Sequence, residues 1–317
     1  MDNINNSIIN HLDFSSYLEA APNINRAVTS ILENSISIFL PYKRIDLSKA
    51  NTTFVANDRT LEIKNELFEK LEIKGRLLGQ IHKDVLEAIL STKKTFDPED
   101  TYFKVRTTAY KLLQKMHRDT SDKQWLLKQI EHISQSRIKI YYTDTNNSKG
   151  KDTFDFAFIS SIRTMEDGKS IEINFTKEYT YFLARNELID YSAYIDDIMS
   201  LKKDIQKIER EIKQEKGVRF KNGGINQEFI KAVVRYVLTH NGKNSQIRIS
   251  NLVAKLNLEK VMSVSEIDMA ITDLRRTKIQ KLLENKFGIT LTNENKTITF
   301  NIPEKKSKQH LQPSLEL

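Results

Sequence analysis

The stretch from residue 223 to residue 303 constrains the fold most, because the spacing of its apolar and polar residues predicts five successive secondary-structure elements. The spacing predicts a helix, a short strand, two further helices and a β-hairpin, over residues 225–240, 246–249, 251–258, 263–283 and 288–302. Ser263 and Glu266 stand three residues apart, the spacing of a capping box, at the start of the third helix. The order helix, strand, helix, helix, hairpin is that of a winged helix, a helix-turn-helix variant.

A second set of elements in the same order precedes this stretch. The pattern predicts a helix over 81–90, a strand over 101–105, two helices over 108–116 and 122–133, and strands over 137–142, 154–159 and 170–175. We interpret 137–142 and 154–159 as its wing, with a flexible tip at 145–150. The chain is therefore expected to be an α+β protein with tandem winged-helix domains joined by a charged helix.

The joining segment carries five apolar residues that step by three and four residues: Ile198, Leu201, Ile205, Ile208 and Ile212. This is a heptad stripe of about two heptads, too short to dimerise firmly alone. The stripe either docks on its own chain, which we favour, or forms a dimer seam. The expected divisions are a flexible segment at 1–20, an N-terminal domain at 21–195, the charged helix and linker at 196–222, a C-terminal DNA-binding domain at 223–303 and a disordered tail at 304–317.

The composition and the placement of charge narrow the class of protein. The chain has 317 residues, no cysteine and a formal charge of +8, and residues 223–317 alone carry a net +6. A surplus of this kind suits a polyanionic partner, although a lysine-rich proteome would also produce it. The absence of cysteine excludes disulfides, thiolate catalysis and Cys-ligated zinc. No run of 18 apolar residues and no secretory signal is evident, so we expect a cytoplasmic protein without a membrane partner.

Sequence signatures of catalysis are missing. No P-loop pattern occurs, and none of the six histidines has a two-His metal spacing. The tyrosines at 179, 181, 191 and 194 cluster as in nicking enzymes, but the His-x-His metal site of that chemistry is absent. We therefore expect no enzyme activity, no cofactor and no bound metal.

The third helix of the C-terminal unit, 263–283, is the expected reading helix. The helical spacing turns Val264, Ile267, Ile271 and Leu274 toward the core. The residues expected to face DNA on this helix are Ser265, Asp268, Met269, Thr272, Arg275 and Arg276, with Lys278 and Lys281 on phosphates. Lys296 is expected in the wing turn, on the DNA backbone. The competing interpretation is a solvated amphipathic helix, which Asp268 and Asp273 favour slightly.

The N-terminal unit is expected to make weaker, backbone-dominated contacts or a dimer interface. Its third helix presents Lys123, Gln124 and Lys128 outward, in a region of mixed charge. Its expected wing carries the basic residues Arg137, Lys139, Lys149 and Lys151.

Five segments follow one another in a distinctive order, at residues 21–23 (Ala-Pro-Asn), 75–90, 109–113, 123–126 and 138–140. Through these segments the chain resembles plasmid replication initiators, and the TrfA-type branch most. It implies binding of direct repeats (iterons) in double-stranded DNA at a plasmid origin, melting of neighbouring A+T-rich DNA, and recruitment of the host initiator and replicative helicase. It also implies a balance between active monomers and inactive homodimers. The long charged segment at 196–222 departs from that pattern and leaves the spacing of the two units open.

Two other functions remain open from the sequence. A winged-helix transcriptional repressor would use the heptad helix as a dimer handle. A structural module would use its winged helices to bind protein. Direct repeats beside an A+T-rich tract would favour the initiator, and a single inverted repeat over a promoter would favour the repressor.

Overall fold

The computed structural model describes residues 28–30, 33–34, 38–65, 68–97, 102–141, 153–185, 188–190, 193–216, 224–240, 245–292 and 296–300. The segments expected to be flexible at 1–20 and 304–317, and also Lys149 and Lys151, lie outside these residues. Helices and strands are mixed along the chain, in agreement with the predicted α+β class. Within the described ranges, every helix is too short or too polar to cross a membrane.

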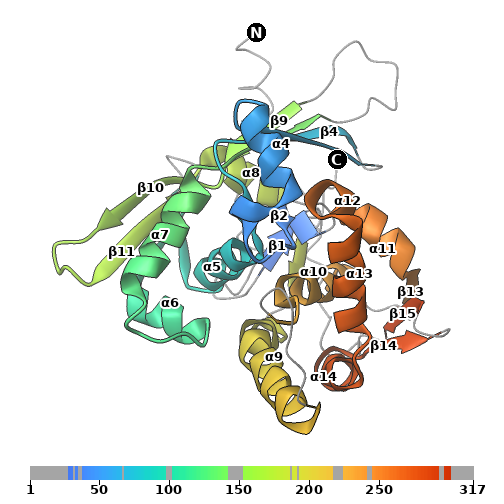
Figure 1. The fold of residues 1–317 in the computed structure, drawn as a ribbon. Helices are drawn as coiled ribbons and strands as arrows, with labels where there is room; N and C mark the ends of the chain where they lie inside the picture. The colour runs from blue at the N-terminus through green and yellow to red at the C-terminus, as the bar shows by residue number, and fades with distance from the viewer. Residues whose placement is uncertain are drawn as a thin grey trace, which may run out of the picture.

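Two buried helices, α5 (Gln80–Leu90) and α10 (Gln227–Leu238), lie beside each other in the middle of the molecule (Figure 1). Ten of the eleven α5 residues are buried, and so is every α10 residue from Glu228 to Leu238. Apolar side chains from both halves of the chain form one core cluster among the described residues. The two sets of elements predicted from the sequence therefore pack through a shared centre.

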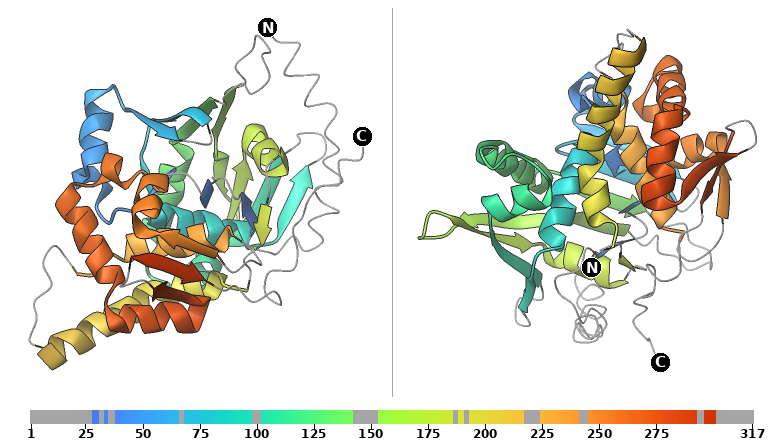
Figure 2. Two further views of the ribbon diagram at one scale, coloured as in Figure 1. Left: turned by 90° about the vertical axis from the view of Figure 1, so that its right-hand side faces the viewer. Right: turned by 90° about the horizontal axis from the view of Figure 1, so that it is seen from below.

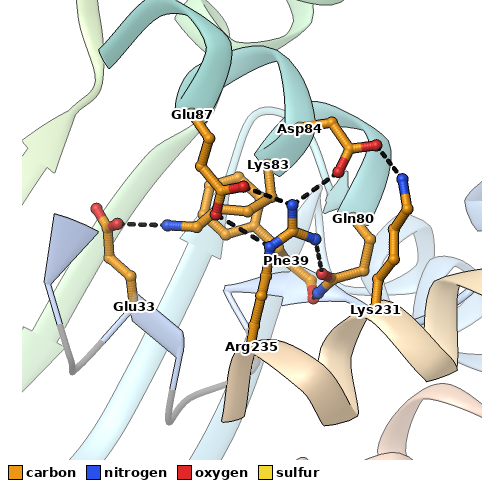
Figure 3. Close-up of polar contacts among 8 residues, drawn as sticks. All are labelled: Glu33, Phe39, Gln80, Lys83, Asp84, Glu87, Lys231 and Arg235. Atoms are coloured by element: carbon orange, nitrogen blue, oxygen red, sulfur yellow. Dashed lines mark hydrogen bonds and ion pairs between the residues drawn. The ribbon is translucent and has the colours of Figure 1, made fainter. Parts of the chain in front are cut away.

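An ionic network joins these two helices, and Figure 3 shows it around Arg235 of α10. The guanidinium contacts Glu87 at 2.6 and 3.0 Å, Asp84 at 2.7 Å and Gln80 at 2.6 Å. Lys231 of α10 also pairs with Asp84. Because buried charges are stable only when paired and hydrogen-bonded, the network fixes one way of packing α5 against α10.

Around α5, the N-terminal unit combines helices with a four-stranded antiparallel sheet. The strands pair in the order β10-β11-β7-β6, and Ile173 of β11 lies between Ile162 of β10 and Val105 of β7. Helices α6 and α7 follow β7 directly and pack against α5. The elements are β6 (Lys94–Asp97), β7 (Tyr102–Thr108), α6 (Ala109–Lys115), α7 (Lys123–Ser134), β10 (Ile159–Thr164) and β11 (Ser170–Phe175).

A second antiparallel sheet has the order β3-β4-β8-β9, and α8 packs on β9 through stacked aromatic rings. The rings of Phe156 and Phe182 lie 4.7 Å apart. The elements around this sheet are η1 (Ile45–Leu47), α4 (Lys49–Ala56), β3 (Thr60–Asn65), β4 (Phe68–Lys74), β8 (Arg137–Tyr141), β9 (Thr153–Ala157) and α8 (Lys177–Arg185). Two pairs of short strands also belong to the N-terminal unit. Strand β1 (Val28–Ser30) pairs with β12 (Leu188–Asp190), and β2 (Phe39–Leu40) pairs with β5 (Leu78–Gly79).

The hairpin predicted as the N-terminal wing is present, but it joins a different sheet from the strand before α6. Strands 137–142 and 154–159 correspond to β8 and β9, and β8 pairs with β4 rather than with the strand before α6. The hairpin that joins β7 is instead β10–β11. Alternation of apolar and polar residues marks a strand but does not specify its partner, so the sequence could not distinguish these two hairpins.

The C-terminal unit surrounds α10 with a three-stranded antiparallel sheet of order β13-β15-β14. Strand β13 and the hairpin β14–β15 agree with the predicted elements. The elements are β13 (Ser245–Arg248), α11 (Ile249–Lys255), α12 (Leu258–Val261), α13 (Val264–Leu274), α14 (Thr277–Phe287), β14 (Ile289–Thr292) and β15 (Thr297–Phe300).

The two units share one topology. In each, the strand that precedes the helix pair joins the second strand of the following hairpin, so that the hairpin's second strand is central. With β6, β8 and β9 left out, the N-terminal series is α5, β7, α6, α7, β10, β11; with α12 and α14 left out, the C-terminal series is α10, β13, α11, α13, β14, β15. In Figure 1, α7 and α13 lie on opposite sides of the central pair α5 and α10.

The predicted single helix over 263–283 is wrong, because the chain breaks it at Arg275 and Arg276. Arg276 is extended, and the Nε2 of Gln280 donates to the carbonyl oxygen of Arg275 at 2.8 Å. The break lets both Leu274 and Ile279 be fully buried. Val264, expected in the core, is 74% exposed, whereas Ile267 and Leu274 are buried as predicted.

Helix α9 (Ile195–Lys216) contains the heptad stripe and packs on α10 and α14. Ile198, Leu201, Ile205 and Ile212 are at most 8% exposed on the chain's own core. The stripe therefore acts as an intramolecular brace in this structure, the alternative that the sequence favoured. Figure 2 shows α9 running along the side of α14.

Candidate nucleic-acid interface

Helix α13 begins with the capping box that the sequence predicts. The Ser263 hydroxyl accepts from the Glu266 backbone N–H, and the Glu266 carboxylate accepts from the Ser263 N–H at 2.9 Å. Tyr42, from the N-terminal half, also donates its hydroxyl to Glu266. Burial and this hydrogen bond raise the pKa of Tyr42 to about 12. The first turn of α13 is thus fixed both by its own N-cap and by Tyr42 from the N-terminal half.

The outer face of α13 carries the short polar residues that the sequence placed there. Ser265, Asp268, Thr272 and Arg275 are exposed, and Met269 and Arg276 are half-buried. Short polar groups on an exposed helix can approach base edges, and an arginine at its end can reach a guanine or a phosphate. The structure thus brings these six candidate residues onto one helix and its C-terminal turn.

Arg276 is held more tightly than Arg275. Its Nε donates to the Asp273 carboxylate at 2.8 Å, while that carboxylate also accepts from the backbone N–H of Asn226 at 3.0 Å. Asp273 therefore links the end of α13 to the residue that caps α10. The side chain of Arg276 is therefore engaged by Asp273 at this junction, rather than free to bind a ligand.

The two lysines expected to contact phosphates, Lys278 and Lys281, differ in the partners that they have in this structure. Lys278 pairs with Glu211 at 3.0 Å and Glu215 at 2.6 Å, both on α9. The hydrogen bonds that Lys278 donates to these carboxylates raise its pKa. Lys281 is exposed on the same helix. Only Lys281 presents a cation that is not engaged by the α9 carboxylates.

The C-terminal hairpin projects beside these helices. Lys296 is exposed in its turn, where its backbone N–H donates to Thr292 at 3.2 Å. The hydroxyls of Thr292 and Thr299 lie 2.9 Å apart across the two strands. Lys296 therefore lies at the tip of a paired hairpin, as the sequence predicts for a wing.

In the N-terminal unit, α7 presents Lys123, Gln124 and Lys128 to solvent. Arg118 precedes α7, and Trp125 lies in the first turn of this helix. The guanidinium of Arg118 lies 3.5 Å from the centre of the Trp125 ring. Trp125 is thereby packed under a cation at the exposed end of α7.

The basic residues assigned to the N-terminal wing lie elsewhere. Arg137 in β8 forms a two-pronged ion pair with Asp155, at 2.7 and 3.1 Å, and Lys139 lies 4.9 Å from the Tyr141 ring centre. The hairpin that matches the C-terminal wing carries Arg163 and Lys169, both exposed. Sequence reasoning missed these two residues; the Glu-Asp-Gly turn at 166–168 was the signal that could have located them.

Metal binding has no candidate in the part of the chain that the structure describes. No group of three or more His, Asp or Glu side chains lies close enough there to hold an ion.

No family model and no curated protein matches the chain. The solved structures that match include two of domains 2 and 3 of RctB. One has a TM-score of 0.38 at 11% identity and covers 76% of this chain and 88% of its own. The other, a selenomethionine derivative, has a TM-score of 0.45 at 10% identity and covers 77% and 90%. Similarity at this level is not evidence for a shared activity.

Proposed function

We propose that the chain binds double-stranded DNA through two winged helices, with α13 and α7 as the helices that enter the major groove. The repeated topology carries this proposal. Each unit has exposed helical residues between the strand that joins its sheet and a hairpin whose second strand is central in that sheet, with α14 between α13 and its hairpin and with β8 and β9 between α7 and its hairpin. That is the arrangement in which a winged helix reads a groove with its third helix and contacts the backbone with its wing.

The side chains on these surfaces fit that role. Ser265, Thr272 and Arg275 on α13 have the donors and acceptors that base edges require. Lys281 and Lys296, with Arg163 and Lys169 on the other hairpin, are exposed cations suited to phosphates. The net +6 of residues 223–317 favours approach to a polyanion.

We further propose that the DNA is a replication origin. The resemblance to plasmid initiators leads to direct repeats as the target, and to the host initiator and helicase as partners. On this proposal the protein acts in the cytoplasm by binding and has no catalytic step. The repressor alternative needs the α9 stripe as a dimer handle, and that stripe is buried on α10 and α14.

The test is a gel-shift titration on duplexes selected from a random-sequence pool. Arg275→Ala should weaken binding of the selected duplex by about tenfold or more, without changing the circular dichroism spectrum. Lys207→Ala, an exposed cation on α9, is the matched control and should bind like the wild type. If no duplex is enriched, or if both variants bind equally, the proposed function is wrong.

A further inference from the structure

A cleft of about 680 Å³ is lined by residues of α4, α7 and the start of α5, together with residues of α9 and α10. Its lining includes apolar and aromatic side chains, among them Phe54, Leu77 and Trp125, together with a set of cations. The volume is that of a small-molecule pocket. A DNA duplex is too wide to enter it, so the cleft is separate from the surface of α13.

The cations of the cleft have few partners of their own. With the other residues that the structure describes, the side chains of Arg59, Arg76, Lys128 and Lys202 form no hydrogen bond or ion pair. Desolvation lowers the pKa of Arg76 and, together with neighbouring cations, that of Lys202. Charges brought together without counterions destabilise a fold, and an anionic ligand would remove that cost.

The lining offers little negative charge in return. Two carboxylates, Asp46 and Glu228, are found among the described residues that line the cleft. Glu228 is buried, and burial raises its pKa toward the neutral form. The cleft is therefore strongly electropositive.

Two buried histidines in the wall add hydrogen-bonding groups rather than charge. His82 Nδ1 accepts from the Gly79 N–H at 2.9 Å, so its Nε2 carries the proton and faces His132 Nδ1 at 3.3 Å. This chain of contacts fixes neutral tautomers for both rings.

We propose that this cleft binds a nucleoside polyphosphate, with its phosphates among Arg59, Arg76 and Lys202. Trp125 and Tyr42 line the same cleft and supply aromatic surface for the base. The base distinguishes this ligand from a bare polyphosphate, which the cations alone would accept. The site adjoins the proposed DNA-binding surface at α7, because Lys128 lines the cleft, but its lining does not include Arg275 or any residue of α13.

Trp125 is the only tryptophan of the chain, so its fluorescence reports on the cleft directly. Adenosine triphosphate without a metal ion should change that fluorescence in a saturable way, and tripolyphosphate should bind more weakly. Arg76→Gln and Lys202→Gln should each weaken nucleotide binding by about tenfold. Lys207→Gln removes an exposed cation on α9 and should bind like the wild type.

The Arg275→Ala protein, in which the DNA surface is altered, should bind the nucleotide normally. This separates failure of the cleft proposal from failure of the DNA proposal. The cleft proposal is overturned if no saturable change occurs, if tripolyphosphate binds as tightly as the nucleotide, or if the cleft variants and the control bind equally.

Discussion

The guanidinium of Arg235 and the carboxylate of Glu87 form a two-pronged ion pair, and both side chains are at most 2% exposed. One residue belongs to the C-terminal unit and the other to the N-terminal unit. The pair therefore couples the folding of one unit to the position of the other.

Replacing Arg235 should show that coupling as a loss of stability. Arg235→Met keeps most of the side-chain volume but removes the two-pronged partner of Glu87 and one of the cations that pair with Asp84. Breaking a buried pair in this way costs about 3–5 kcal/mol. Urea denaturation should show that loss in the free energy of unfolding.

A second variant gives this prediction its control. Arg235→Met combined with Glu87→Gln removes both charges of the pair and should recover part of the lost stability. Arg210→Met, on the exposed face of α9, should change the free energy of unfolding by less than about 0.5 kcal/mol. Equal effects of Arg235→Met and Arg210→Met would contradict the assigned coupling.

Acid should destabilise the protein through its buried histidines. Burial, followed by the neighbouring His132 and Arg76, lowers the pKa of His82 to about 3, and burial with nearby cations lowers that of His132 to about 4. In the unfolded chain the pKa of a histidine is about 6.5. Below that pH the histidines bind protons in the unfolded state but not in the folded state. The free energy of unfolding therefore falls as pH drops from about 6.5 toward these values.

His82→Asn removes one of these titrating groups. A plot of unfolding free energy against pH should therefore become shallower between pH 6 and 4.5, by about one proton. Denaturant titrations at several pH values measure the slope, which does not depend on the absolute stability of the variant. Parallel profiles for the variant and the wild type would show that His82 is not held neutral.

Two lysines of α14 should differ in their contribution to DNA binding. Lys281 is exposed, whereas Lys278 is engaged by Glu211 and Glu215. Lys281→Gln should reduce the slope of log affinity against log salt by about one, as expected when one phosphate contact is lost. Lys278→Gln should leave that slope unchanged. The reverse order would mean that α9 releases Lys278 when DNA binds.

The local elements were predictable because their signals are local. The capping box at Ser263, the apolar face of α10 and the alternation of β14 and β15 all depend on residues close in sequence. The break between α13 and α14 has no Gly or Pro to mark it. It arises from the burial of both Leu274 and Ile279 and from the Asp273 contacts, which are tertiary effects.

The cleft and the true N-terminal hairpin were not predictable for a related reason. Lys202 is far in sequence from Arg59 and Arg76, and the three side chains line one cleft only after α4, α5 and α9 have packed. The partner of β8 is likewise decided by β4, over sixty residues earlier. By contrast, Ser265, Thr272 and Arg275 were found because helical spacing alone places them on one exposed face.

The most direct test of the account is a guanine-N7 interference footprint on a selected duplex. Two winged helices on one duplex predict two major-groove patches about one helical turn, or about 10 base pairs, apart. Arg275→Ala should erase one patch, and Lys123→Ala combined with Gln124→Ala should erase the other. A footprint without major-groove contacts, or one that neither variant alters, would contradict the claim that α13 and α7 both read the DNA.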